Sequence, residues 1–264
     1  MNNLMILIKK ECVQMLRDFK VIWLPIVFIF LGATQPIVTH YLPSILGALG
    51  GGQGITIDPS MAAQQGGEVL ASTLGSQFDQ LGLMILVISM MGAIQADKAN
   101  GMLAFILTRP VTVTSYILGK IVSNYVMVAF SVMIGYFTSY LYINYLFTVV
   151  PFLHMITGLL FYLIWVLFIV SFTTMISAIF QTQGIIALIS IVFLLACRII
   201  VGLNLIVDQV NPASMSKHAM EMLVTGEVNA TAMINVLLTI IWILLTLFVT
   251  YYWIANKKFN YESL

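Results

Sequence analysis

Long apolar runs alternate along this chain with short segments that hold most of its charged residues. A transmembrane helix needs about 20 predominantly apolar residues, and runs of that order recur through the sequence. They lie at roughly 21–39, 79–96, 116–143, 152–179, 185–206 and 232–255. The pattern predicts an all-α polytopic membrane protein in which residues 1–264 form one domain with six transmembrane helices.

The first 19 residues follow a different pattern, because apolar side chains recur there at steps of three and four. The apolar positions of this repeat are Leu4, Ile8, Cys12, Met15 and Phe19. Such spacing is typical of an amphipathic helix that lies in the headgroup plane of a membrane. A basic anchor without regular structure is the alternative. The run at 21–39 exceeds the apolar core of a signal peptide, so we expect it to be retained.

Composition agrees with a membrane protein. The chain has 264 residues, of which 61% are hydrophobic and 8% charged, and its mean hydropathy is +1.03. Soluble domains carry about 25% charged residues, so these few charges cannot cover a water-facing surface. The formal net charge is +1, and no basic patch interleaved with aromatic residues occurs. Nucleic acid is therefore not an expected partner.

The basic residues are distributed unevenly between the two sides of the predicted membrane. Of the eleven Lys and Arg residues, four precede residue 21, three lie in 97–120 and two lie in the tail after 255. The segment 40–80 holds none. The positive-inside rule therefore predicts a multi-pass membrane protein with both termini and the segment 97–120 in the cytoplasm.

The sequence shows no pattern that is typical of an enzyme. It lacks Gly-x-x-x-x-Gly-Lys-Ser/Thr, His-Glu-x-x-His and Cys-x-x-Cys, and its apolar runs hold almost no ionisable pairs. We therefore expect no catalytic residue and no metal or cofactor site in this chain. Cys12 and Cys197 are expected to be free packing residues. Met215, His218, Met220 and Met222 could bind a soft metal, but an amphipathic helix explains their spacing equally well.

Arg198 is the exception among the predicted spans, because it lies about two-thirds of the way along 185–206. A charged residue inside a membrane usually faces a cavity or a partner. One interpretation places Arg198 in a translocation pathway or at a dimer interface. The other is that its side chain reaches out to the headgroups at the outer surface.

The outer segments are expected to contain little regular structure. The Gly-rich segment 40–80 predicts a long loop with a short helix near 60–75. Asn211 and Pro212 resemble the start of a helix, and the residues that follow have helical spacing. This second helix is expected to lie on the outer membrane surface like a lid.

The segment 97–120 combines charged residues with a short apolar stretch bounded by Gly and Pro. Its characteristic positions are Asp97, Gly101, Leu103, Ile106, Leu107, Pro110, Val111, Leu118, Gly119 and Lys120. They resemble the first cytoplasmic loop of ABC-2 type permeases, the membrane subunits of a class of ABC exporters. Met102 replaces the usual small hydroxyl residue, and Val113 stands where a basic residue is common.

The resemblance implies a type V exporter-like transmembrane domain with an N-terminal elbow helix and a coupling loop at 98–114. In that family the loop contacts a separate ABC ATPase subunit, which binds ATP and Mg²⁺. The residues expected to make this contact are Asp97, Gly101, Leu103, Phe105, Ile106, Leu107, Arg109 and Pro110. A second copy or a related permease would complete a dimer in the lipid, and the cargo would be a peptide, a lipid-like molecule or an ion.

Two functions from other classes compete with a transport subunit. A non-transporting membrane sensor or regulator could anchor a partner protein and use the outer loop 40–80 as its ligand surface. An intramembrane enzyme is the third possibility, which the scarcity of paired polar residues in the spans argues against.

Overall fold

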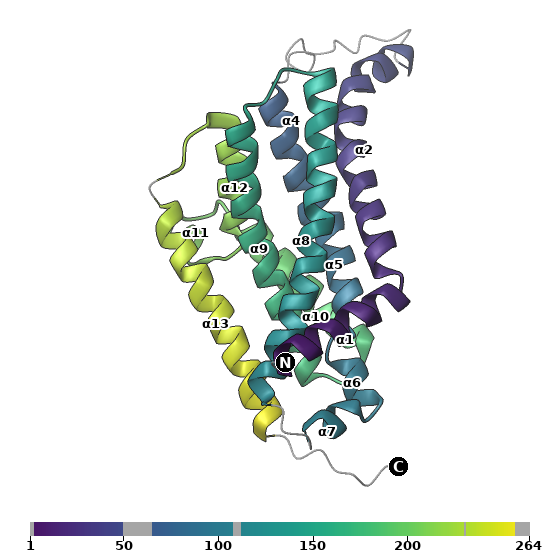
Figure 1. Ribbon diagram of the computed structural model, residues 1–264. Coiled ribbons are helices and arrows are strands. Elements are labelled where there is room, and N and C mark those ends of the chain that lie inside the picture. Colours follow the sequence, from purple (N-terminus) through teal and green to yellow (C-terminus); the bar gives the residue numbers. More distant parts are fainter. Residues whose placement is uncertain (1–2, 50–64, 108–111, 230, 257–264) are drawn as a thin grey trace.

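The computed structural model is a bundle of long, roughly aligned helices (Figure 1), and it describes residues 3–49, 65–107, 112–229 and 231–256. Within these ranges, six helical stretches are long and apolar enough to cross a membrane. They are Lys20–Ser44, Gly66–Ala99, Val113–Leu146, Phe152–Ile179, Gln183–Ile200 and Ala232–Asn256. The prediction of an all-α membrane domain with six spans is confirmed.

The N-terminal helix α1 (Asn3–Arg17) crosses the lower end of the bundle in Figure 1. Its apolar side chains Met5 and Leu16 are exposed, whereas Met15 packs inward. An exposed apolar side on a helix that lies across a bundle end suits the boundary between headgroups and acyl chains. The chain then turns at Phe19, which has φ 55°, and enters the first span, α2 (Lys20–Leu49).

The second span starts earlier than the sequence suggested and consists of four helical pieces. These are α4 (Gly66–Ser72), the π-helix η1 (Thr73–Gly82), α5 (Leu83–Met90) and α6 (Gln95–Ala99). The expected loop at 40–80 is thus helical up to Leu49 and again from Gly66, and 50–64 lies outside the described residues. The Glu68 carboxylate accepts from the Gln65 N–H at 3.3 Å and caps the helix start.

The long helix α8 (Val113–Leu146) contacts α2 along much of its length, and glycines permit the closest approach. A Cβ at Gly32 would collide with the Gly135 carbonyl oxygen, and one at Gly135 with the Phe28 carbonyl. The backbones of the two helices therefore touch, as small residues allow in membrane helix pairs. At 1.5 Å per residue, the 34 residues of α8 extend well beyond the hydrocarbon layer of about 30 Å.

We expect Gly135→Val to prevent the native packing of α8 on α2. The new side chain would force backbone atoms apart, and overpacking of this kind costs on the order of 3 kcal/mol. Size-exclusion chromatography of detergent-purified protein should show an aggregated or absent peak. Gly184→Val is the matched control, because nothing lies within 4 Å of a Cβ at that position; equal behaviour of the two variants would contradict the packing described here.

The helices that close the bundle are α9 (Phe152–Ile179), α10 (Gln183–Ile200) and α13 (Ala232–Asn256). Between α10 and α13 the chain forms the short α11 (Leu205–Val210) and then α12 (Ser214–Thr225). The Asn235 side chain on α13 fixes this connection, because its amide donates to the carbonyls of Asp208, Gln209 and Asn211 at 2.8–3.1 Å.

The expectation that the helix after Asn211 lies on the outer surface is wrong. Helix α12 packs against α4, η1 and α9, and Ser214, Met215 and Ala219 are fully buried. Small residues permit this burial, since a Cβ at Gly67 would collide with the Leu223 carbonyl. Helix α12 is therefore part of the bundle and stands beside α9 in Figure 1.

Candidate functional site

The second span breaks between α5 and α6, and a single side chain from α9 satisfies the interrupted backbone. The Ser177 hydroxyl accepts from the N–H groups of Ile94 and Gln95 at 3.1 and 3.0 Å and donates to the Met91 carbonyl at 2.9 Å. Interruptions of a membrane helix are tolerated where a neighbouring helix supplies such partners. The break sets α6 apart from α5 as a separate short helix.

Asp97 on α6 lies in a buried cluster of charged residues. Its carboxylate is 2.8 Å from the Lys120 ammonium on α8 and 3.5 Å from that of Lys10 on α1. Glu11 on α1 is 2.9 Å from Lys120 and 3.2 Å from Lys10. The Tyr116 hydroxyl donates to Asp97 at 2.8 Å. These five residues join α1, α6 and α8.

The cluster balances two carboxylates with two ammonium groups. The side chains of Lys120, Asp97 and Glu11 are only 3%, 5% and 8% exposed, whereas that of Lys10 is 31% exposed. Charges buried this deeply are costly unless each has a partner. Removing one member therefore leaves an uncompensated charge inside the protein, which is why the cluster fixes the relative positions of the three helices.

Polar contacts also attach α6 to the opposite side of the bundle. The Lys98 ammonium donates to the carbonyls of Ala178 and Phe180 at 2.9 and 2.5 Å, where α9 ends. A cation is favourable at this position because helix C-termini carry unpaired carbonyls and partial negative charge. The Gln95 amide donates to the Gln181 carbonyl at 2.8 Å.

Helix α6 is thus held from two sides, and we call this arrangement the α6 joint. It consists of Lys10, Glu11, Asp97, Tyr116 and Lys120 on one side and of Gln95, Lys98 and Ser177 on the other. Through the first set α6 contacts α1 and α8, and through the second it contacts α9. A displacement of α6 would therefore act on several spans at once.

The residues expected to contact an ATPase lie in different environments. Gly101, with φ +68°, ends α6 in a left-handed conformation that suits glycine. Helix α7 (Met102–Leu107) follows, with Met102 42% exposed. Leu103 and Ile106, 1% and 9% exposed, are buried in the core of the bundle. These two side chains therefore do not form the exposed apolar surface that the sequence suggested.

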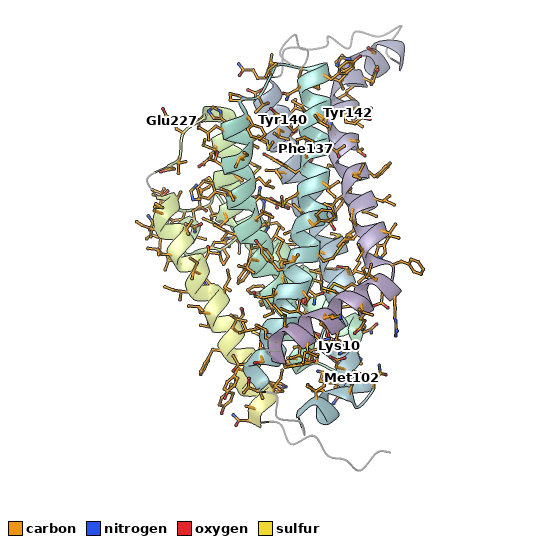
Figure 2. All side chains as sticks on the ribbon, viewed as in Figure 1. Lys10, Met102, Phe137, Tyr140, Tyr142 and Glu227 are labelled. Atoms are coloured by element: carbon orange, nitrogen blue, oxygen red, sulfur yellow. The ribbon has the colours of Figure 1, made fainter. Side chains whose placement is uncertain are left out.

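The other members of the expected contact set are placed less fully by the structure. Phe105 and Leu107 belong to α7. Arg109 and Pro110 lie outside the described residues. Figure 2 shows Met102 at the same end of the bundle as Lys10, and Glu227, Tyr140 and Tyr142 near the opposite end.

A second buried ion pair lies toward the other end of the bundle. The Arg198 Nε on α10 is 2.6 Å from the Asp79 carboxylate on η1, and the Ser216 hydroxyl of α12 donates to the same oxygen. Asp79 is fully buried. The Arg198 guanidinium is thus paired inside the protein, so the interpretation that it reaches out to the headgroups is wrong. The π-helix brings Asp79 into this position, and π-helical turns often occur at functional sites.

A third charged pair lies in the connection between the spans α10 and α13. Asp208 on α11 is 2.8 Å from the Lys217 ammonium and accepts the Gly202 N–H at 2.7 Å. Partial burial alone would raise the pKa of the Asp208 carboxyl, but these two hydrogen bonds and the lysine charge lower that pKa below its usual value. The Asp208 carboxyl is therefore ionised at neutral pH, and its pairing with Lys217 holds α11 beside α12.

Residues 5–259 match the family described as ABC-2 family transporter protein. The chain belongs to the ABC-2 transporter family. It is also similar to the uncharacterized transmembrane protein YxlG of Bacillus subtilis (strain 168), with 34% identity over 227 residues, which cover 86% of this chain and 87% of the relative. The resemblance drawn from 97–120 is thereby confirmed, and the protein is a permease-type membrane subunit of this family.

Sequence reasoning on this ABC-2 family member missed most of the α6 joint. Asp97 and Lys120 both belong to the loop pattern, but nothing in that pattern says that they pair. No motif in the sequence marks Glu11, Tyr116 or Ser177. One signal could have pointed to Glu11, because an acidic residue in the middle of an amphipathic membrane helix needs a basic partner.

We expect Ser177→Ala to loosen the α5–α6 break. The backbone N–H groups of Ile94 and Gln95 would lose their acceptor. Each unsatisfied buried group costs about 1–3 kcal/mol. Hydrogen exchange of peptides that contain Ile94 and Gln95 should become faster. Ser131→Ala is the matched control, because the Ser131 hydroxyl donates only to Met127 in its own helix. Unchanged exchange in Ser177→Ala would contradict the role given to this hydroxyl.

Proposed function

We propose that this chain is the permease subunit of an ABC transporter and is driven by a separate ABC ATPase subunit that binds ATP and Mg²⁺. The observation that carries the proposal is the α6 joint. Helices α6 and α7 lie at the end of the bundle where α1 also lies and where α13 ends (Figure 1). From that end, the buried Asp97–Lys120 pair joins α6 directly to the span α8.

The joint supports a mechanical coupling. A partner that moves α7 would move α6, because only Asn100 and Gly101 separate the two helices. Asp97 would transmit this movement to α1 and α8, and Lys98 to the end of α9. The spans would then tilt relative to one another, as packed bundles respond by rigid-body shifts between discrete arrangements.

The remaining parts of the proposal concern orientation, assembly and cargo. The excess of Lys and Arg at the α1 end supports a cytoplasmic location for both termini and for α6 and α7 in a bacterial plasma membrane. A second permease copy or a related permease would complete the pathway, with Arg198 as a candidate residue along it or at the dimer interface. Export of a peptide, a lipid-like molecule or an ion is the transport activity we propose.

The test uses Met102, the exposed side chain of α7. The tagged full chain should purify from its native membranes with a subunit that hydrolyses ATP. Met102→Glu should remove that subunit, because a charge placed in an apolar contact is costly to desolvate. Glu227→Lys, an exposed change near the opposite end, should leave it bound. Retention of the ATPase by Met102→Glu, or no ATPase in the wild-type preparation, would count against the proposal.

A further inference from the structure

A cavity of about 310 Å³, with charged side chains in its wall, lies between the α1–α2 turn and the break in the second span. Two interruptions meet there, since α1 ends at Arg17 before α2 begins, and α5 ends at Met90 before α6 begins. The Lys20 ammonium connects them by donating to the Ser89 carbonyl at 2.8 Å. Because neither segment is helical at this level, the space that packed helices would otherwise fill is left as a cavity.

The cavity wall carries both signs of charge in equal number. Glu11 and Asp18 contribute carboxylates, and Lys20 and Lys120 contribute ammonium groups. Glu11 and Lys120 are paired with each other at 2.9 Å. Lys20 has three N–H groups, one of which reaches Ser89, and Asp18 is exposed. A lone anion would be repelled by both carboxylates and a lone cation by both ammonium groups, whereas a ligand with both charges would meet a partner for each.

The position of the cavity identifies where such a ligand would come from. Helix α1, which forms one wall, exposes Met5 and Leu16 at 66% and 58%, so it lies at the depth of the lipid headgroups. Trp23 also lines the cavity, and tryptophan is enriched at that depth. The volume is at the lower end of ligand pockets, about 300–1,000 Å³. It suits a headgroup and is too small for a bulky solute.

We propose that this cavity binds the phosphoethanolamine headgroup of a membrane phospholipid, with its phosphate on Lys20 and its ammonium on Asp18 and Glu11. A primary ammonium can donate hydrogen bonds to carboxylates. A choline group has no such donors and is usually held by several aromatic rings, of which this wall offers Trp23 alone. An anionic headgroup would have only the lysines in its favour and would be repelled by both carboxylates.

Native mass spectrometry of the full chain, with whatever subunits accompany it, tests this assignment. Detergent-solubilised protein is titrated with phosphatidylethanolamine, phosphatidylglycerol and phosphatidylcholine of identical acyl chains. Phosphatidylethanolamine should bind best, and Asp18→Asn and Lys20→Gln should each weaken it about tenfold or more through loss of a charge-assisted hydrogen bond. Lys9→Gln, an exposed change on the same helix, should have no effect.

Several outcomes would overturn the assignment. They are equal binding of the three lipids, phosphatidylethanolamine binding that neither variant weakens, and binding of soluble glycerophosphoethanolamine in place of the lipid. Lys20→Gln can disturb the fold through Ser89, so Asp18→Asn, at an exposed carboxylate, carries the test if Lys20→Gln does not purify. The measurement requires neither ATP nor transport, so it does not depend on whether the proposed function is correct.

Discussion

Lys120→Met is expected to destabilise the protein strongly, because it removes the buried cation between Asp97 and Glu11 and leaves the partly exposed Lys10 to balance both carboxylates. Breaking a buried ion pair by removing one partner costs about 3–5 kcal/mol. For a chain of this size, that loss corresponds to a fall in the unfolding temperature on the order of 10 °C. Thermal unfolding followed by size-exclusion chromatography would measure it. Lys9→Met, an exposed lysine on α1, should cause almost no change.

A neutral triple variant separates the structural role of the α6 joint from its coupling role. Glu11→Gln, Asp97→Asn and Lys120→Met together remove the buried charges, and such replacements are often close to neutral for stability. We expect the triple variant to recover most of the stability lost in Lys120→Met. In the assembled transporter it should hydrolyse ATP without moving cargo. Full transport by the triple variant would show that the charges do not transmit movement.

Arg198→Met is expected to have the second-largest effect, since it leaves the fully buried Asp79 unpaired. The expected loss is again about 3–5 kcal/mol. Asp79→Asn should restore stability in the Arg198→Met background, giving an interaction energy of 0.5–3 kcal/mol or more in a double-mutant cycle. Lys217→Met, which breaks a more exposed pair with Asp208, should cost at most about 1 kcal/mol.

One outcome of the double-mutant cycle of Arg198 and Asp79 would contradict their pairing. If Asp79→Asn destabilises the Arg198→Met protein as much as it destabilises the wild type, the two residues do not interact. The guanidinium would then be free to reach the headgroups, as one interpretation of the sequence held. Because Ser216 of α12 shares the Asp79 carboxylate, we also expect faster hydrogen exchange in α12 when Arg198 is replaced.

Hydropathy and periodicity were sufficient to predict the membrane class, the six spans and the N-terminal amphipathic helix. These features depend on whether a segment lies in lipid, in water or at the boundary between them, and the residues of the segment itself indicate which. Family membership was predictable from Asp97 to Lys120 because that loop has a specific residue pattern. Each of these predictions uses local information along the chain.

The errors arise where burial depends on a neighbour. Helix α12 was expected on the outer surface, yet glycines of α4 and α9 let it pack closely, since Gly67 lies against the Leu223 backbone and Gly158 against Ala219 and Leu223. The segment before residue 79 looked like a loop because it is rich in Gly and Gln, yet it starts a span. Likewise, Leu103 and Ile106 looked available for a partner, but the bundle itself buries them.

Pairs of charges that lie far apart in sequence are the part that a single sequence cannot specify. Glu11, Asp97 and Lys120 meet because α1, α6 and α8 converge, and Asp79 meets Arg198 across 119 positions. Patterns among neighbouring residues do not indicate which residues far apart in the sequence come into contact. What the sequence does indicate is that every charge inside a membrane domain needs a partner, and the structure identifies which one.

The claim that a separate ATPase drives this chain through α7 is tested most directly by cross-linking at Met102. Cys12 and Cys197 are free thiols, so Met102→Cys is placed in a Cys12→Ser, Cys197→Ser background, and a short thiol–amine cross-linker is applied to native membranes. The account predicts one major product that joins this chain to a nucleotide-hydrolysing subunit. Labelling of Met102→Cys by an impermeant reagent from outside intact cells, with no such product, would contradict it.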